Sequence, residues 1–439
     1  MKRLLLGLGL AVIPFVTIAG FDSREPKLIV AVIIALCLVL RALSTNGLGK
    51  LENPFLLAIL AYIPVSSLFA YKEHLTMAIG IGKKVAVVPL MAGKIPLTNF
   101  WIWKPMLFIL VFFLMYLAIK NIRPNGMIDL MVTVGAILSI YAVVQYLNTL
   151  IPSVNIEQFF SRSAAQHADN PSVASTLGQP TVLATFLAML LPLAVYKQRW
   201  VCLGLMIFVI GITHSQIAIG ASIAGLLFYL ATLSKKHFIL AILIGLVSIA
   251  GACQTNFRVG DGDRFRNWKM IVEDIGSSED VQNTRINRTL KQKLIFKQRY
   301  PLTGRGLGSF EYMFHKKHTF GNGREYMEAH NDPLEIAYMI GLIGLILYLC
   351  AWGWHFIRYF DFSERKVALV SSLIVINICS LGLFVFQLGA HIFYTVTIIG
   401  LLGGKDEEDG PIFTWGVRMY ERLRRAVWRR ICLQSGKTA

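Results

Sequence analysis

A histidine and a set of arginines meet where a polar segment of the chain gives way to an apolar one. His330 begins the run His330-Asn331-Asp332-Pro333-Leu334-Glu335, and apolar residues follow from Ile336. Guanidinium groups bind phosphate oxygens through paired N–H donors and stay charged when partly desolvated, while an imidazole accepts protons near neutral pH. The combination predicts displacement of a phosphate-bearing leaving group, with His330 as a base. The arginines of segment 254–333 are Arg258, Arg264, Arg266, Arg285, Arg288, Arg299, Arg305 and Arg324.

Two short helices are predicted to present some of these arginines. Apolar residues recur every fourth position in 284–299, which favours a helix on the membrane surface with Arg285 and Arg288 on the adjacent stripe. A second helix is predicted over 264–275, with Arg264 beside its apolar face and Arg266 as a further substrate-binding candidate. The alternative for each arginine is a solvated or headgroup-facing surface position.

The residues around His330 suit the start of a helix. Nearby arginines would disfavour the imidazolium form and keep the ring able to accept a proton. Asn331 or Asp332 can cap the helix, and Pro333 fits its first turn. Glu335 is a candidate for orienting an acceptor or pairing with an arginine, and a glutamate favoured by the helix dipole is the alternative. For His330 the alternative is a capping or interfacial side chain.

A glycine-rich stretch, 301–308, contains Arg305 and precedes His330. It lacks the lysine of a nucleotide-binding loop and follows no predicted strand, so we interpret it as a flexible turn that lets the backbone approach a substrate. Asp261-Gly262-Asp263 is an acidic pair of the kind that holds divalent cations, but such pairs are common in turns. Since arginines can neutralise a diphosphate alone, neither a metal nor a cofactor is predicted.

The composition is that of a membrane protein. Hydrophobic residues make up 55% of the 439 residues and charged residues only 15%, a balance that excludes a soluble globular protein of this length. The net charge of +18 comes mostly from short connectors between apolar runs. Membrane orientation explains that distribution, so nucleic acid is not predicted as a partner. The six cysteines form no metal-binding or disulfide spacing.

Apolar runs predict an all-α polytopic integral membrane protein with about twelve transmembrane helices. The start Met1-Lys2-Arg3 and the run after it are interpreted as a retained first helix rather than a cleaved signal peptide. If that helix runs outward, the short basic connectors all fall in the cytoplasm, together with both termini. The predicted spans are 4–20, 27–43, 54–71, 102–119, 127–148, 178–196, 200–213, 216–233, 237–253, 334–357, 367–385 and 386–403.

This topology divides the chain into four parts. Helices one to nine occupy 1–253, a large outer segment occupies 254–333, helices ten to twelve occupy 334–403, and a basic tail occupies 404–439. Arginines alternate with apolar residues in 415–433, which predicts an amphipathic helix on the inner leaflet, with partner binding as the alternative. Segment 72–101 is predicted to dip into the membrane or lie at its surface.

Several motifs together resemble the O-antigen ligase and O-antigen polymerase superfamily of bacterial surface polysaccharide assembly. They are Pro301-Leu302-Thr303-Gly304-x-Gly306-x-Gly308-x-Phe310 and His330-Asn331, followed after nine residues by Gly341-Leu342-Ile343-Gly344. The run Gly178-Gln179-Pro180-Thr181 also looks like a family landmark. The resemblance covers about 100–360. One departure is Ser215-Gln216, where the family commonly has Ser-Arg, so Arg264 or Arg288 would bear more of the phosphate-binding role.

The resemblance implies a glycosyltransferase at the periplasmic face of a bacterial inner membrane. An undecaprenyl-diphosphate-linked glycan is the implied donor, a lipid A core sugar the implied acceptor, and membrane lipids surround the protein. Arg264 and Arg288, with Arg285 or Arg305, would hold the diphosphate, and His330 would take the proton of the acceptor hydroxyl or position that hydroxyl. Asn331, Glu335 and Arg266 are the remaining substrate-binding candidates.

Three other functions stay open from the sequence. A polymerase would use the same donor and add its glycan to another lipid-linked glycan. A solute transporter would be expected to carry Asp, Glu or Lys near the bilayer midplane, and the predicted spans hold few such residues. A structural scaffold for an envelope complex is the third alternative.

Overall fold

The computed structural model describes residues 2–16, 24–45, 52–66, 109–120, 126–150, 173, 175–213, 215–233, 301–307, 331–360, 363–383 and 385–403. Every regular element within these ranges is a helix, which confirms the all-α class for this part of the chain. The helix count of twelve and the architecture of 254–300 and 308–330 remain predictions, because they involve residues outside those ranges. The predicted span 237–253, segment 72–101 and the tail 404–439 also lie outside them.

The helices follow the apolar runs closely. Three described helices are long and apolar enough to span a membrane, over Pro26–Ser44, Met127–Leu147 and Asp332–Tyr359. Shorter apolar helices include Pro54–Ser66 and Ile109–Ile119. The labelled elements are α1 (Lys2–Val12), η1 (Ile13–Phe15), α2 (Arg24–Ser44), α6 (Met127–Leu150), η3 (Ser175–Leu177), α8 (Pro180–Tyr196), α9 (Trp200–Ile212), α10 (Gln216–Leu233), α15 (Asp332–Tyr359), α16 (Glu364–Ser380), η4 (Val385–Gln387) and α17 (Gly389–Leu402).

Two boundaries differ from the predicted spans by more than three residues for local reasons. The first helix was predicted over 4–20, but α1 ends at Val12 and continues as the 3-10 turn η1, which contains Pro14. Proline lacks the N–H that an α-helix needs in its interior. The predicted run 367–385 also extends too far, because α16 ends at Ser380 and η4 follows as a separate turn. This turn matters for the site described below.

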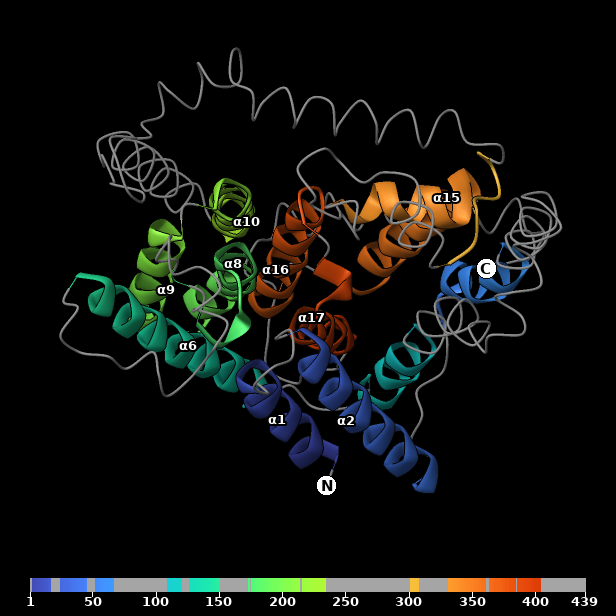
Figure 1. The fold of residues 1–439 in the computed structure, drawn as a ribbon. Coiled ribbons are helices and arrows are strands. Elements are labelled where there is room, and N and C mark those ends of the chain that lie inside the picture. The colour runs from blue at the N-terminus through green and yellow to red at the C-terminus, as the bar shows by residue number, and fades with distance from the viewer. Residues whose placement is uncertain are drawn as a thin grey trace, which may run out of the picture.

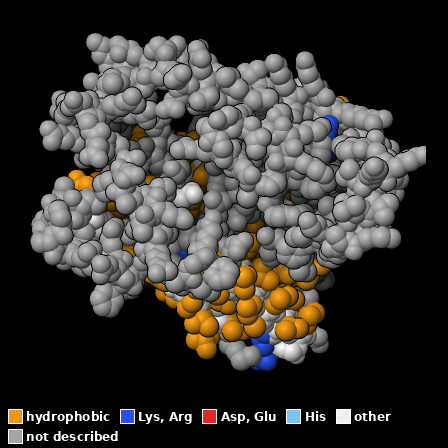
Figure 2. Space-filling view, in the orientation of Figure 1, with side chains coloured by type: hydrophobic (Ala, Val, Ile, Leu, Met, Phe, Trp, Pro, Cys, Tyr) orange, Lys and Arg blue, Asp and Glu red, His pale blue; other side chains and the backbone are white. Residues whose placement is uncertain are grey.

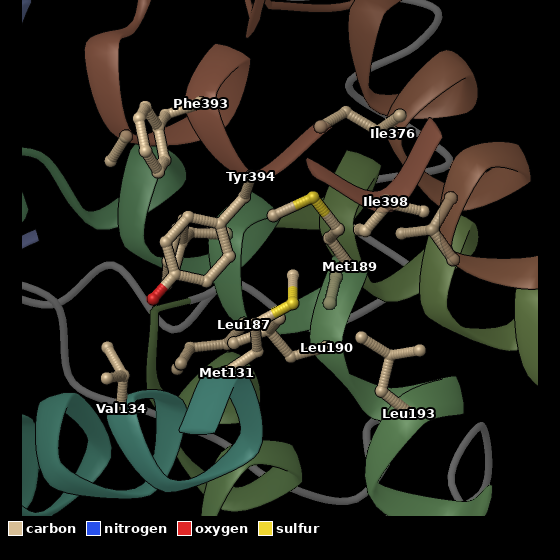
Figure 3. Close-up of a cluster of buried hydrophobic side chains, with 14 of the residues drawn as sticks. Met131, Val134, Leu187, Met189, Leu190, Leu193, Ile376, Phe393, Tyr394 and Ile398 are labelled. Carbon is tan, nitrogen blue, oxygen red and sulfur yellow. The ribbon is translucent and has the colours of Figure 1, made fainter. Parts of the chain in front are cut away.

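Helix α8 lies at the centre of the described part (Figure 1). Every residue from Val182 to Ala194 is buried, as expected for a helix that is hydrophobic on all sides. It packs against α6, α9, α10 and α16. Figure 3 shows the resulting cluster, in which Leu187 and Leu190 of α8 lie among side chains of α6, α16 and α17, including Met131 and Tyr394. This core holds the helices that carry the site in fixed positions.

Helices α1 and α2 expose an apolar surface. Leu4 is 74% exposed and Leu40 is 65% exposed. Hydrophobic side chains cover the lower part of the molecule in Figure 2, over these two helices, and Lys or Arg side chains lie at its lowest point. Basic residues occur at the start of α1, which begins with Lys2 and Arg3, and in the last turn of α2, which contains Arg41. A band of exposed leucines bordered by basic residues is typical of a lipid-facing surface.

Charged side chains join several helices at one end of the molecule. Lys197 lies 3.2 Å from Asp129, which connects the end of α8 to the start of α6. Arg365 at the start of α16 donates to the Leu401 carbonyl oxygen of α17 at 3.5 Å. The helix ends that the prediction assigns to the cytoplasm therefore gather together.

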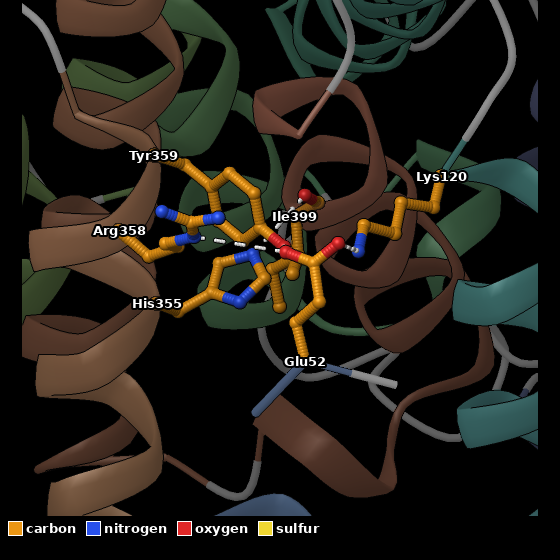
Figure 4. Close-up of polar contacts among 6 residues, drawn as sticks. All are labelled: Glu52, Lys120, His355, Arg358, Tyr359 and Ile399. Carbon is orange, nitrogen blue, oxygen red and sulfur yellow. Dashed lines mark hydrogen bonds and ion pairs between the residues drawn. The ribbon is translucent and has the colours of Figure 1, made fainter. Parts of the chain in front are cut away.

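Glu52 is the centre of a polar cluster at this end (Figure 4). Its carboxylate accepts from Tyr359 Oη at 2.9 Å and pairs with Lys120 Nζ at 2.9 Å and Arg358 Nε at 3.7 Å. His355 lies beside the cluster, with Nε2 3.4 Å from the Ile399 carbonyl oxygen. The cluster ties together the connector before helix Pro54–Ser66, the end of helix Ile109–Ile119 and the end of α15. It is separated from the start of α15 by that helix, which is roughly 40 Å long at 1.5 Å per residue.

Candidate functional site

Three of the eight predicted site residues lie in the described part of the chain: Arg305, Asn331 and Glu335. They occupy the glycine turn, defined here as residues 301–307, and the first turn of α15. The other five, His330, Arg264, Arg266, Arg285 and Arg288, lie outside the described residues. Their roles remain predictions, and the site is built below from the residues that border them.

Helix α15 is broken at Gly341, where the backbone leaves helical geometry at φ 71° and ψ −178°. An unbroken helix would bond the Leu342 and Ile343 N–H groups to the carbonyl oxygens of Tyr338 and Met339, four residues earlier. In this structure those N–H groups donate instead to the carbonyl oxygens of Pro301 and Leu302, at 3.0 and 3.2 Å. The break therefore removes two helical hydrogen bonds. The glycine turn supplies new acceptors for both N–H groups.

The glycine turn also satisfies the two carbonyl groups that the break leaves open. Arg305 N–H donates to the Tyr338 carbonyl oxygen at 3.1 Å, and Gly306 N–H donates to that of Met339 at 2.6 Å. All four backbone groups at the α15 break are thus paired, as buried backbone groups require. The turn supplies the hydrogen-bond partners that the broken helix lacks. Backbone hydrogen bonds at both ends of the turn fix its position against α15.

Two glycines make this close approach possible. Gly304 has φ 74°, and a Cβ there would collide with Gly341 N and the Met339 carbonyl oxygen. A Cβ at Gly341 would collide with the Leu302 carbonyl oxygen. The sequence predicted that glycine here lets the backbone approach a substrate, and that remains a prediction. Within the described residues, the group that the turn approaches is α15.

Arg305 is held beside α15 by its backbone and its side chain. The guanidinium carbon lies 5.6 Å from the centre of the Tyr338 ring, within the range of a cation–π contact. Its Nε atom is buried and has no hydrogen-bond partner among the described residues. A guanidinium carries further N–H donors besides Nε, and its charged, planar fork suits an anionic ligand.

Asn331 is the cap of α15. Its Oδ1 accepts from Leu334 N–H at 3.0 Å, and its Nδ2 donates to the Leu381 carbonyl oxygen at 2.8 Å, just after α16. Pro333 occupies the first turn, so both predicted features of this helix start are confirmed. The cap fixes the backbone that immediately follows His330 to the end of α16.

Glu335 and Asp332 are buried on one side of the first turn, at 6% and 3% exposure. Glu335 Oε1 accepts from Gln387 Nε2 at 2.8 Å, and Asp332 Oδ2 accepts from Phe386 N–H at 3.3 Å. Both partners belong to η4. The glutamate therefore has a hydrogen-bonding partner beyond the helix dipole, one that the sequence alone did not suggest.

The arrangement places Arg305 of the glycine turn against the same helix, α15, whose start is fixed by Asn331. Tyr338 lies seven positions after Asn331, which is about 10 Å along the axis of α15. The described residues contain no group of three or more side chains suited to a metal ion. The chemistry that this geometry favours is anion binding by Arg305 next to the groups carried at the start of α15.

Sequence reasoning missed the residues that hold these candidates in place. Ser66 and Tyr62 contact the glycine turn, and Gln387 contacts Glu335. Each is far from its partner along the chain and belongs to no motif. The one available signal was that Ser66 and Gln387 are polar residues near the ends of apolar runs.

Comparison with known protein families narrows the functions that this geometry could serve. The family described as O-antigen ligase has a model that matches residues 201–349. The match supports the O-antigen ligase and polymerase superfamily and covers about a third of the chain. The matched region runs from α9 through the glycine turn to Leu349 in α15, so it contains all eight predicted site residues. No curated protein matches the chain. Proteins of this family act on lipid-linked glycans and lipid acceptors, so the match suggests an activity of the membrane glycosyltransferase kind.

Proposed function

We propose that the protein is an O-antigen ligase that transfers a glycan from undecaprenyl diphosphate to a sugar hydroxyl of the lipid A core, at the periplasmic face of a bacterial inner membrane. The observation that carries the proposal is the family match, because it spans the arginine-rich segment, the glycine turn and α15 together. The Arg305 guanidinium beside Tyr338 of α15 and the capped helix start after His330 support it.

In the proposed reaction the acceptor oxygen attacks the anomeric carbon, and the bond from that carbon to the diphosphate oxygen breaks. The diphosphate leaves with the electron pair, and one displacement inverts the anomeric carbon. His330 takes the hydroxyl proton or positions the hydroxyl. The lipid-linked bond supplies the driving force, so no nucleotide or metal is required.

The arginines stabilise the charge that develops on the leaving diphosphate. Arg264 and Arg288 are proposed as its main ligands, with Arg285, Arg266 and Arg305 completing the binding surface. Asn331 and Glu335 act at the start of α15, where Asn331 holds the helix in register with α16 and Glu335 holds it to η4. Their contribution is the placement of the residue before the helix.

Transfer by purified protein tests this function directly. A defined undecaprenyl-diphosphate glycan is supplied with lipid A core, and glycan on lipid A is measured. His330→Ala should lower the rate about 100-fold or more, the loss expected for a general base. Arg264→Lys and Arg288→Lys should be impaired, because a point charge does not replace a bidentate fork. Arg199→Lys, at the opposite end of the molecule and 59% exposed, is the matched control and should behave as wild type.

The products separate the alternatives. Glycan on lipid A supports the ligase, whereas lengthened lipid-linked glycan without lipid A product indicates the polymerase. Normal transfer by His330→Ala would remove the proposed base. Absence of both products, together with solute flux into vesicles, would indicate a transporter.

A further inference from the structure

The junction between the glycine turn and α15 is clamped by a side chain from a distant helix. Ser66 is the last described residue of helix Pro54–Ser66 and is fully buried, at 0% exposure. Its hydroxyl lies 2.8 Å from the Thr303 carbonyl oxygen and 3.3 Å from that of Met339. A single O–H group therefore bridges the turn and the helix that it completes.

The Thr303 and Met339 carbonyl groups that Ser66 contacts are both close to Arg305 in the bonding pattern of the junction. Thr303 precedes Gly304, whose left-handed backbone leads into Arg305. Met339 O also accepts from Gly306 N–H, immediately after Arg305. Ser66 is thus linked to the chain on both sides of Arg305. It bonds directly to Thr303, and it shares the Met339 carbonyl oxygen as an acceptor with Gly306 N–H.

A second contact from the same helix supports this arrangement. Tyr62, one turn before Ser66, lies with its hydroxyl 3.4 Å from the Leu302 carbonyl oxygen. That oxygen is the acceptor of Ile343 N–H across the α15 break. Helix Pro54–Ser66 thus presents two hydroxyl groups to the glycine turn. More than two hundred residues lie between this helix and the turn in the sequence.

We propose that Ser66 is a positioning residue for Arg305: its hydroxyl clamps the glycine turn to α15 and so sets where the guanidinium lies against Tyr338 and toward the diphosphate. The clamp itself is a property of the fold. Its consequence for the donor rests on the proposed function, because only there does Arg305 bind a diphosphate.

The substitution Ser66→Ala removes the bridging hydroxyl and leaves two buried carbonyl oxygens with one donor fewer. Ser139→Ala is the matched control, since Ser139 is also at 0% exposure and donates to the Gly135 carbonyl oxygen at 2.8 Å within its own helix α6. Both variants lose one buried hydroxyl bond. Only the first loosens the junction that carries Arg305.

The decisive measurement is the KM for the lipid-linked donor in a double-mutant cycle with Arg305→Lys. Ser66→Ala should raise the donor KM about fivefold in the wild-type background, the effect of one hydrogen bond, with kcat and the acceptor KM little changed. In the Arg305→Lys background the same substitution should change the donor KM less than about twofold, because the group that it positions is already gone. An equal effect in both backgrounds, or an equal effect of Ser139→Ala, would overturn the proposal.

Amide hydrogen exchange tests the clamp without any activity. Exchange at Arg305, Gly306, Leu342 and Ile343 should be faster in Ser66→Ala and unchanged in Ser139→Ala. Unchanged exchange at these four amides would show that Ser66 clamps nothing. If the wild type transfers no glycan but exchange responds as expected, the proposed function fails and the clamp stands, so the two failures are distinguishable.

Discussion

Single polar side chains at the start of α15 each join that helix to another element. Asn331 bonds to both its own helix and the Leu381 carbonyl oxygen, and Glu335 bonds to Gln387 in η4. In a largely apolar environment an unpaired polar group is unfavourable, so these bonds define one position for the helix start. These bonds fix the backbone of Asn331, the first described residue after the predicted base His330.

Substitutions at Asn331 should separate capping from bridging. Asn331→Ala loses both hydrogen bonds and should lower the free energy of unfolding by about 2 kcal/mol, whereas Asn331→Ser keeps a good cap, loses the bond to Leu381 and should lower it by about 1 kcal/mol. Denaturant unfolding in mixed micelles measures both. Equal stabilities of the two variants would mean that the bridge to Leu381 contributes nothing.

Glu52 gives a pH-dependent contribution to stability at the other end. The hydrogen bond from Lys120 lowers the pKa of its carboxyl below the ordinary 4.5, against an opposing effect of burial. A group whose pKa is lower in the folded state stabilises the fold above its unfolded pKa and loses that stabilisation as the pH falls through the folded value. The wild type should therefore lose stability as the pH falls below about 4.5, and the loss should be modest because the Glu52 side chain is 41% exposed.

The variant Glu52→Gln should show a flatter dependence of the unfolding midpoint on pH between about 5 and 3, together with lower stability at pH 7. Asp129→Asn serves as the comparison, because it removes an acid from a different ion pair at the same end. A profile for Glu52→Gln that parallels the wild type would contradict the assigned role of this carboxylate.

At the scale of elements, the important feature is that α15 is completed by another segment. The backbone geometry of Gly341 belongs to a region that essentially only glycine adopts, and it persists because four hydrogen bonds to the glycine turn stabilise it. Breaking the helix without the turn would leave two donors and two acceptors unpaired. The turn and the break therefore depend on one another, and each is expected to be lost when the other is disrupted.

Two glycine-to-alanine substitutions in α15 test this dependence. Gly341→Ala should lower the free energy of unfolding by about 2 kcal/mol or more, from backbone strain and the collision with the Leu302 carbonyl oxygen. Gly353→Ala, in the helical part where a Cβ meets nothing within 4 Å, should be neutral or stabilise by up to about 1 kcal/mol. The measurement is the unfolding midpoint with donor KM beside it. Similar behaviour of the two variants would show that the α15 break is not required.

For the whole molecule, apolar runs predicted most helices because a membrane-spanning helix needs a long apolar stretch whatever its neighbours. The cap at Asn331 was also predictable, because capping is local. The α15 break was not, since backbone hydrogen bonds between Leu302 and Ile343 leave no pattern in side chains. Ser66 and Gln387 were missed for a related reason: their partners lie far away in the chain. His330 and the four arginines at 264, 266, 285 and 288 remain predictions from the motifs.

The distribution of charge over the molecule predicts its orientation in the membrane. Lys120, Lys197, Arg358 and Arg365 lie at one end, and Leu381 with the start of α15 lies at the other. Basic connectors face the cytoplasm in most membrane proteins. Residues next to Asn331 should therefore face the periplasm, where a lipid-linked glycan would be used.

Single cysteines in a background without the native six test this orientation in intact cells. Leu381→Cys, at a position that is 55% exposed, should react with a membrane-impermeant maleimide added from outside. Gln198→Cys, in the exposed connector between α8 and α9, should react only after the membrane is permeabilised. The permeabilised sample is the control for reactivity of each site. Labelling of Gln198→Cys from outside, with protection of Leu381→Cys, would place the start of α15 in the cytoplasm and remove the periplasmic reaction from consideration.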